Sequence, residues 1–308
     1  MTMKIDVFAH VLLPEFYKKM LELDKNLVEK MPFIQNPVLT DIKARREHMP
    51  INTKQIISYI NANPEDYLDS DTAAILVNEA NEELLTTIQE NRDIFAGGVA
   101  MIAMNNIPEA VRVIEEFVPT HPEVLGIQVF TRHLGKSISY KAYKPIFEAA
   151  ARLDVPLWLH PVFDERKPEN NIIFSWEYEL TQAMLEIVQS GYFKEFPNLK
   201  ILIHHGGAMV PYFAGRIEHI LPETQASDFK KFYVDTALLG NTKALELCVD
   251  YYGSDHVLFG TDAPLGILPA GATETIANAI EEMDLSIDDK KKIFSGNAQK
   301  LYNVGNLL

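Results

Sequence analysis

Histidine and aspartate side chains stand at the ends of short apolar runs in this chain of 308 residues. His10 closes the first of these runs, and later runs close on His160, His205 and Asp262. Imidazole nitrogens and carboxylate oxygens suit Zn²⁺, and also Mn²⁺ or Fe²⁺. If the runs are strands whose ends meet, these three histidines and one aspartate predict a site for one divalent metal. Water on such a metal becomes acidic enough to act as a nucleophile near neutral pH, with Asp262 as a ligand or as the base.

Each of these residues also has a structural interpretation. A single histidine at a strand end more often makes an ordinary hydrogen bond than binds a metal, and Asp235, which ends a further run, is typical of a loop cap. Gly206 and Gly207 allow either a plain turn or a close approach of the backbone to a ligand. A site is favoured because several such side chains coincide at one predicted edge. The other histidines do not, and we expect them to be structural: His48, His121, His133, His219 and His256.

Eight apolar runs alternate with longer amphipathic stretches along the chain. Several runs are apolar almost throughout, which is typical of strands covered on both faces. The stretches between them repeat apolar residues at helical spacings, as in the helix that Asp71 is expected to cap. This alternation predicts a (β/α)8 TIM barrel, an α/β fold. The predicted strands are residues 4–11, 54–60, 95–103, 124–131, 155–161, 200–206, 232–237 and 256–264.

The chain is predicted to form one domain, residues 1–308, because no linker or low-complexity tract divides it. The rival fold, a doubly wound open sheet, loses support because neither GxGxxG nor GxxxxGK[ST] follows any predicted strand. Catalytic groups of a barrel lie at the C-terminal ends of its strands. The insertion at 12–53 leaves that end of strand one, and residues 163–175 leave that end of strand five. Both are expected to form a lid or pocket wall over the barrel mouth.

The composition excludes several classes of protein. Lysine and arginine number 28 against 43 aspartates and glutamates, which gives a net charge of −15 and argues against a nucleic-acid surface. The single cysteine, Cys248, excludes a disulfide framework and a Cys-based zinc finger. The first residues do not resemble a signal peptide, and no apolar stretch reaches the length of a membrane span. We therefore expect a soluble cytoplasmic protein that acts on a small molecule.

Five segments, in order along the chain, carry a family resemblance. They are IDVFAHVLLP near the start, LHP at 159–161, HHGG at 204–207, GTDAP at 260–264 and IFSGNAQKLYNV at 293–304. Together they resemble the amidohydrolase superfamily, and within it the "amidohydrolase 2" branch of aminocarboxymuconate-semialdehyde decarboxylase. The resemblance implies a (β/α)8 barrel of the metal-dependent hydrolase type with one divalent metal, usually zinc, manganese or iron being alternatives. It also implies His10, His160 and Asp262 as metal ligands, with Asp262 and His205 as catalytic residues.

One position departs from the family pattern. The family has H-x-H or E-x-H on strand one, whereas this chain has Phe8 two residues before His10. Phenylalanine cannot bind a metal, so three protein ligands and a water would remain, which is still a workable catalytic zinc site. His204 has no clear counterpart in the family. The residues expected to contact substrate are Phe8, Phe163, Trp176 and either Arg45 or Arg46, since the family often pairs an arginine with a substrate carboxylate.

These features predict an enzyme that acts on a small carboxylated or cyclic organic acid. Nonoxidative decarboxylation and metal-assisted hydrolysis would use the same residues, so both stay open, and the family branch favours decarboxylation. The departure at Phe8 keeps two alternatives open: a metal-independent, lactonase-like hydrolase, and a non-catalytic barrel that binds a ligand. The resemblance also implies a homodimer or a larger homo-oligomer.

Overall fold

The eight predicted strands are present and form one parallel sheet. The computed structural model describes residues 3–162 and 171–303. The neighbours in the sheet follow one another in chain order, as they do in a (β/α)8 barrel. This confirms the predicted fold class. The strands are β1 (Lys4–Val11), β2 (Thr53–Tyr59), β3 (Phe95–Ala100), β4 (Val124–Phe130), β7 (Leu157–His160), β8 (Ile201–Ile203), β9 (Tyr233–Asp235) and β10 (Val257–Leu258).

The barrel closes where the last strand meets the first. The amide of Val7 donates to Phe259 O at 2.8 Å, and the amide of Asp262 donates to Phe8 O at 2.8 Å. The amide of His10 in turn donates to Ala263 O at 2.6 Å. These bonds continue past the short β10 ladder, so residues 259–263 run beside β1 and carry Asp262 to the barrel mouth.

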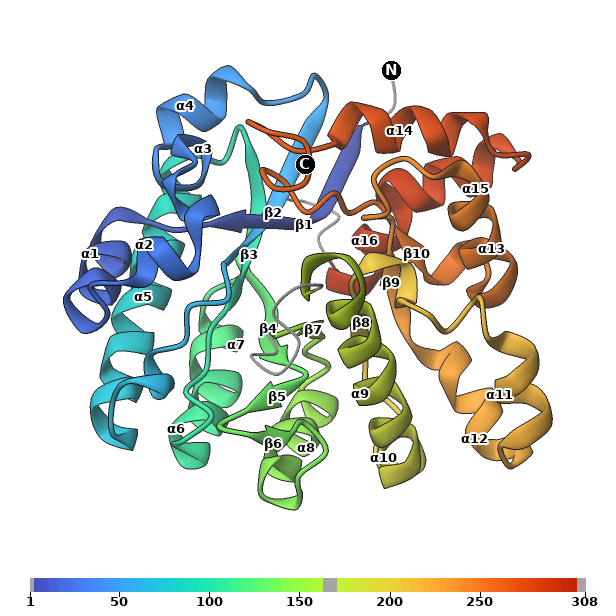
Figure 1. Cartoon of the computed structure of the whole chain (residues 1–308), viewed down its shortest axis with the longest axis horizontal. Helices are drawn as coiled ribbons and strands as arrows, with labels where there is room; N and C mark the ends of the chain where they lie inside the picture. The colour runs from blue at the N-terminus through green and yellow to red at the C-terminus, as the bar shows by residue number, and fades with distance from the viewer. Residues whose placement is uncertain (1–2, 163–170, 304–308) are drawn as a thin grey trace.

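Helices surround the strands, and Figure 1 shows them arranged around the sheet in chain order. The longest, α5 (Ser70–Glu90), is capped at its N-terminus by Asp69, whose side chain accepts from the amides of Asp71 and Thr72. The expected cap at Asp71 is therefore wrong by two residues, because Asp69 is the residue that keeps an extended backbone. The other main helices are α6 (Ile107–Arg112), α8 (Lys144–Arg152), α9 (Trp176–Ser190), α11 (Ala214–Ile220), α13 (Thr242–Tyr252), α14 (Thr273–Glu282) and α16 (Asn297–Tyr302).

The insertion at 12–53 folds into short helices on the outside of β1 and β2 (Figure 1). Its apolar side chains, such as Phe16, Met20 and Leu39, pack in one cluster with β1, β2 and α5. The side chain of Asn36 donates to Pro269 O at 2.8 Å, which ties the insertion to the loop after β10. The helices are α1 (Pro14–Leu23), α2 (Leu27–Lys30), α3 (Pro37–Thr40) and α4 (Ile42–Glu47), with the 3₁₀ turn η1 (Pro32–Gln35).

The barrel interior is a packed apolar core. Inward side chains such as Ile5, Ile56 and Leu202 share one buried cluster with residues of α16. Trp158 Nε1 donates to the hydroxyl of Tyr302 on α16 at 2.6 Å, which satisfies the indole inside the core. The core therefore supports the polar layer above it. In the described part of the chain, no helix is long and apolar enough to cross a membrane.

Candidate active site

Four histidines and two aspartates gather where the strands end. His10 lies near the end of β1, and His160 is the last residue of β7. The remaining four follow or end β8, β9 and β10, so they reach the same mouth from neighbouring strands. The histidines are buried, whereas the Asp262 side chain is 19% exposed. The six are His10, His160, His204, His205, Asp235 and Asp262.

His10 and Asp262 face one another across the closure of the barrel. His10 Nε2 lies 3.2 Å from Asp262 Oδ1, and His10 Nδ1 lies 3.3 Å from the hydroxyl of Ser58 on β2. Two donors bound to one zinc in a tetrahedron lie roughly 3.4 Å apart, because each bond is about 2.1 Å long. His10 and Asp262 are thus spaced as two ligands of one metal would be.

His160 is held in the form of imidazole that binds metals. Its Nδ1 donates to Pro161 O at 2.6 Å, so the lone pair is left on Nε2. Its ring centre lies 5.1 Å from that of His10. Burial, together with the neighbouring His10, lowers the pKa of His160 well below its ordinary value. The ring is therefore neutral at pH 7.

His205 forms a partly buried pair with a glutamate that the sequence did not indicate. Its Nδ1 lies 2.8 Å from Oε1 of Glu177, the second residue of α9. Burial by itself would lower the pKa of His205, but the carboxylates of Glu177 and Asp262 outweigh it and raise the pKa to about 10. His205 is therefore an imidazolium cation at neutral pH, next to a neutral His160.

His204 pairs with the carboxylate that ends β9. Its Nδ1 lies 2.7 Å from Asp235 Oδ2, and both side chains are fully buried. Asp235 also accepts from the amide of Ala237 at 3.0 Å, as a loop cap does. The expected capping role is therefore present, but the same carboxylate also orients an imidazole. His204 Nε2 is buried and has no hydrogen-bond partner among the described residues.

Phe8 lies in the middle of these imidazoles and is fully buried. Its ring stacks on that of His204, with centres 3.5 Å apart and planes 10° from parallel. The ring centres of His10 and His160 are 4.7 and 5.7 Å away. Phe8 thus faces the same space as the histidines and makes the floor of that space apolar.

The two arginines expected to meet a substrate carboxylate are engaged elsewhere, so this expectation is corrected. Arg45 is 2% exposed and donates to His10 O at 2.7 Å and to Gln55 Oε1 at 2.9 Å. Arg46 is on the surface, where it pairs with Asp93 and Asn91. Both lie on α4 and point to strand backbone or to residues that precede β3. The sequence correctly predicts that both arginines belong to the insertion, but it does not predict the directions of their side chains.

The aromatic residues predicted to line the site have different outcomes. Trp176 starts α9, with its ring centre 6.1 Å from that of His160 and 6.5 Å from that of His205. Phe130, a further aromatic residue at the end of β4, has its ring centre 5.5 Å from that of His160. Phe163 lies outside the described residues. Trp176 and Phe130 therefore both lie next to the imidazole of His160.

Asp262 is held in an unusual backbone conformation by its neighbours. Its φ angle is +63°, a region that residues other than glycine rarely adopt. The preceding Thr261 donates its hydroxyl to Asp6 Oδ2 at 2.6 Å and its amide to Asp6 Oδ1 at 3.0 Å. The buried Asp6 thereby fixes the loop that presents Asp262. Asp6 lies within the predicted first strand, and no local pattern in the sequence indicates this bond across 255 residues.

The donor atoms at the mouth are of the types that bind a divalent metal, although their side chains are not arranged around one point. Among the described residues, no three His, Cys, Asp or Glu side chains already have the arrangement of a metal site. However, His204 Nε2 is buried without a hydrogen-bond partner among the described residues, and the buried His10 Nε2 has Asp262 Oδ1 3.2 Å away but no well-aligned hydrogen bond. A buried, unpartnered nitrogen is costly unless something binds it. The residues present therefore fit a metal ion in their chemistry.

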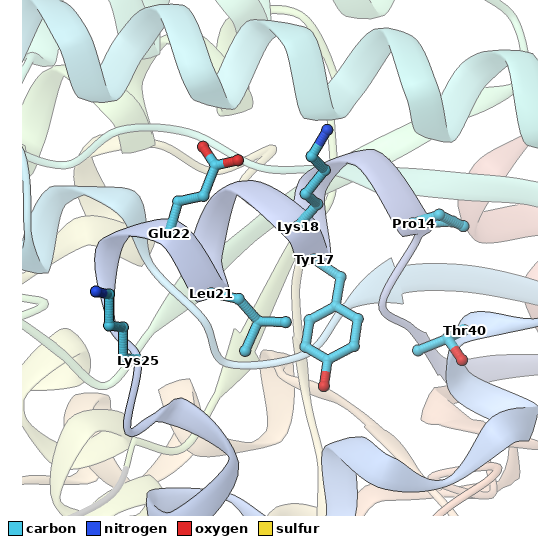
Figure 2. Close-up of a pocket in the computed structure, with 7 residues that line it drawn as sticks. All are labelled: Pro14, Tyr17, Lys18, Leu21, Glu22, Lys25 and Thr40. Carbon is cyan, nitrogen blue, oxygen red and sulfur yellow. The ribbon is translucent and has the colours of Figure 1, made fainter.

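A separate hollow of about 560 Å³ lies on the surface of the insertion, and Figure 2 shows the side chains around it. Its walls come from α1 and the end of α3, and none of the imidazoles or carboxylates described above contributes to it. It is therefore not part of the candidate active site. The lining residues are Pro14, Tyr17, Lys18, Leu21, Glu22, Lys25 and Thr40.

Comparison with known proteins matches almost the whole chain to one family. The family model described as Amidohydrolase matches residues 5–304. A 6-methylsalicylic acid decarboxylase of Penicillium expansum is 26% identical over 268 residues, which cover 81% of this chain and 82% of that protein. A 2-amino-3-carboxymuconate-6-semialdehyde decarboxylase of Dictyostelium discoideum is 30% identical over 258 residues, covering 77% of this chain and 67% of that protein.

Solved structures share the fold at lower identity. The 5-carboxyvanillate decarboxylase of Sphingomonas paucimobilis superimposes with a TM-score of 0.85 at 19% identity, covering 98% of this chain and 99% of that one. A dihydroxybenzoic acid decarboxylase of Polaromonas sp. JS666, with bound manganese and the inhibitor 2-nitroresorcinol, gives a TM-score of 0.81 at 24% identity, covering 99% and 98%. At these identities the likeness establishes the barrel and its strand order.

Proposed function

The chain belongs to the amidohydrolase family, and from this membership we propose that it is a metal-dependent carboxy-lyase. Its reaction would be the nonoxidative removal of CO₂ from a small aromatic or unsaturated carboxylic acid. The relatives from Penicillium and Dictyostelium are named as decarboxylases and align over two thirds or more of both chains, which supports this reaction. The observation that carries the proposal is the meeting of His10, His160, His205 and Asp262 at one barrel mouth.

We assign the metal to His10, His160 and Asp262. The spacing of His10 and Asp262 supports this assignment, and so does the free Nε2 that the Pro161 contact leaves on His160. When bound, the ion would supply positive charge to the carboxylate of the substrate and to an adjacent oxygen. Zinc and manganese both accept this donor set, and manganese is bound in the Polaromonas structure.

Asp262 and His205 would manage the proton of the reaction. A proton adds to the ring carbon that bears the carboxylate, the bond from that carbon to the carboxylate breaks, and its electron pair returns to the ring as CO₂ leaves. The cationic His205 holds a proton at neutral pH, and its pair with Glu177 orients the ring. Asp262 is the more exposed group at the mouth and would pass the proton to the carbon.

The other side chains at the mouth would bind the body of the substrate. Phe8, Phe130 and Trp176 present rings to the imidazole cluster, so a flat, apolar ring would fit against them and water would be excluded. A chain of net charge −15 repels an anion at long range, so the positive charge of His205 is needed at the mouth. These features favour a small aromatic acid over a larger charged one.

The reaction is tested by incubating protein loaded with Zn²⁺ or Mn²⁺ with 6-methylsalicylate, 2,6-dihydroxybenzoate and 5-carboxyvanillate. We expect CO₂ release together with a product that carries one deuteron when the reaction runs in D₂O. Asp262→Asn should lower turnover by about 10² to 10⁴-fold and leave the melting temperature within a few degrees. The exposed Asp250 on α13 supplies a matched control, since Asp250→Asn should change neither.

Failure to release CO₂ from any of these acids would overturn the assignment of the reaction. A 2-keto-4-carboxy-3-hexenedioate hydratase of Sphingobium sp. is also similar, at 27% identity over 173 residues that cover 51% of this chain and 49% of that protein. If the same metal-loaded protein instead added water to an unsaturated carboxylic acid, its reaction would be that of a hydratase, as in this relative.

We further propose that the protein forms a homo-oligomer through the surface around α11. No residue of α11 is buried, which is unusual for a helix that flanks a barrel. Tyr212 and Ile220 are 77% and 64% exposed at its two ends. Phe213, 39% exposed, adjoins Tyr212, and an exposed apolar patch of this kind is typical of an interface. Light scattering on the purified protein should give a multiple of 34.9 kDa, and Tyr212→Glu should shift it toward the monomer.

A further inference from the structure

His204 is the one imidazole of the cluster that the proposed reaction leaves unused. Its ring is fully buried, and its Nε2 has no hydrogen-bond partner among the described residues. A nitrogen in this condition costs free energy that a bound cation would recover. The ring centre of His204 lies 5.7 Å from that of His160, within the same cluster as His10.

The surroundings of His204 fix both its tautomer and the orientation of its ring. Asp235 Oδ2 lies 2.7 Å from Nδ1, so that nitrogen carries the proton and the lone pair is on Nε2. Phe8 covers one face of the ring, and Trp158 lies edge-on at 5.5 Å. A carboxylate behind an imidazole that is free at its other nitrogen is the usual arrangement of a metal-bound histidine.

We propose that His204 Nε2 is a further ligand of the divalent metal, which would then be held by His10, His160, His204 and Asp262. This inference rests on the metal site of the proposed function and adds a donor to it. Three imidazoles and one carboxylate suit Zn²⁺ or Mn²⁺. Phe8 supplies no donor atom, and its stacked ring holds His204 in place instead.

The first measurement counts the imidazole ligands in the unaltered protein. Replacing the metal with Co²⁺ shifts the N–H proton of each coordinated imidazole far outside the normal NMR range. The N–H groups are protected from exchange because Ser58, Pro161 and Asp235 hold Nδ1 of His10, His160 and His204. We expect one shifted, exchangeable signal from each of the three histidines. Signals from His10 and His160 alone would overturn the inference without requiring any variant to fold.

The second measurement is the Zn²⁺ dissociation constant, obtained by competition with a chelator. His204→Asn should weaken binding by about 100-fold or more, and Asp235→Asn by about 10 to 100-fold, the usual cost of an outer-shell partner. His133→Gln is the matched control. His133 is also buried and lies 3.3 Å from a carboxylate, that of Glu65, but it is outside the cluster, so its loss should leave the affinity unchanged.

A substitution at position 8 then tests whether His204 binds the metal or only packs beside it. The ring of Phe8 borders His10, His160 and His204, so Phe8→His places a new nitrogen beside the same ion. This change should recover most of the lost affinity in the His204→Asn background. Equal effects of Phe8→His with and without His204 would contradict the inference.

The two proposals can fail separately. If the unaltered protein binds neither Zn²⁺ nor Mn²⁺, the metal-dependent function is overturned together with this inference. If the protein binds one equivalent and His204→Asn binds it equally well, only the role of His204 is overturned.

Discussion

Replacement of Glu177 by glutamine should lower the pKa of His205 by about one to two units. Glu177 Oε1 lies 2.8 Å from His205 Nδ1, and the side chains are 24% and 10% exposed. Burial opposes the charge of His205, and Glu177 and Asp262 together raise its pKa to about 10. A hydrogen bond to a charged group contributes about 1.5–3 kcal/mol, and one pKa unit corresponds to about 1.4 kcal/mol. Glutamine keeps a hydrogen bond but removes the charge.

The assay is an NMR titration of His205 in protein with isotopically labelled histidine. Its signal is assigned from the spectrum of His205→Gln. Glu179→Gln is the control, because Glu179 lies on the same helix and is more buried than Glu177, with a side chain 6% exposed, but pairs with Arg132 at 2.8 Å. That variant should leave the pKa of His205 unchanged. If the cation of His205 is needed for turnover, the alkaline limb of kcat/KM should move to lower pH by the same amount in Glu177→Gln.

The direction of the effect on stability follows from the same pKa. A histidine whose pKa is raised in the folded chain stabilises it fully below pH 6.5, and that contribution is lost as the pH rises through about 10. Glu177→Gln should therefore lower the free energy of unfolding most below pH 6.5 and progressively less toward pH 10. A pKa of His205 that is the same or higher in the variant would refute the reasoning.

Two further predictions concern residues that support the site. Burial raises the pKa of Asp6 to about 7, so its contribution to stability is present below about pH 4 and is lost as the pH rises to about 7. In thermal melts, the melting temperature of Asp6→Asn should therefore lack that part of the pH dependence. The same dependence of melting temperature on pH in the variant and the unaltered protein would contradict this prediction. Arg45→Met should lower the free energy of unfolding in urea by about 3 kcal/mol, because it leaves the buried His10 O and Gln55 Oε1 without a hydrogen-bond donor. Arg46→Met should cost less than about 1 kcal/mol, because its pair is exposed, and equal costs would be evidence against the assigned roles.

The fold could be predicted from the sequence because the strands of a barrel are buried on both faces. This burial produces the apolar runs, and β1 begins and ends at the residues expected. The later runs were predicted too long. The run at 256–264 contains only two ladder residues, Val257 and Leu258, and the rest pairs irregularly with β1. Apolar composition reports burial, and it does not distinguish a ladder from a buried loop beside one.

Only those residues of the candidate site that lie at the ends of strands could be predicted from the sequence. His10, His160, His205 and Asp262 each end a run, so their meeting follows from the barrel. Glu177 could not be found in this way, because it lies on a helix, 28 residues from the histidine that it contacts. The sequence also predicts the insertion but not the directions of its side chains. Either Arg45 or Arg46 was therefore expected to contact substrate, whereas Arg45 donates to His10 O and Gln55 Oε1.

The consecutive residues His204 and His205 end up in opposite chemical states because the backbone turns sharply between them. His204 has the extended backbone of the strand that it follows, with φ −75° and ψ 168°, and it points to Asp235. His205 has a φ of +56°, which turns its side chain to Glu177 instead. Burial keeps His204 neutral, with its pKa well below the ordinary value, while the carboxylates around His205 keep that ring charged.

The two states suit two different tasks. A metal needs a neutral imidazole, and a proton donor needs a cation. If His204 is a metal ligand, two adjacent residues of one loop supply both the neutral ligand and the cationic proton donor. The positive φ of His205 separates the two side chains, so this turn matters as much to the site as the histidines themselves.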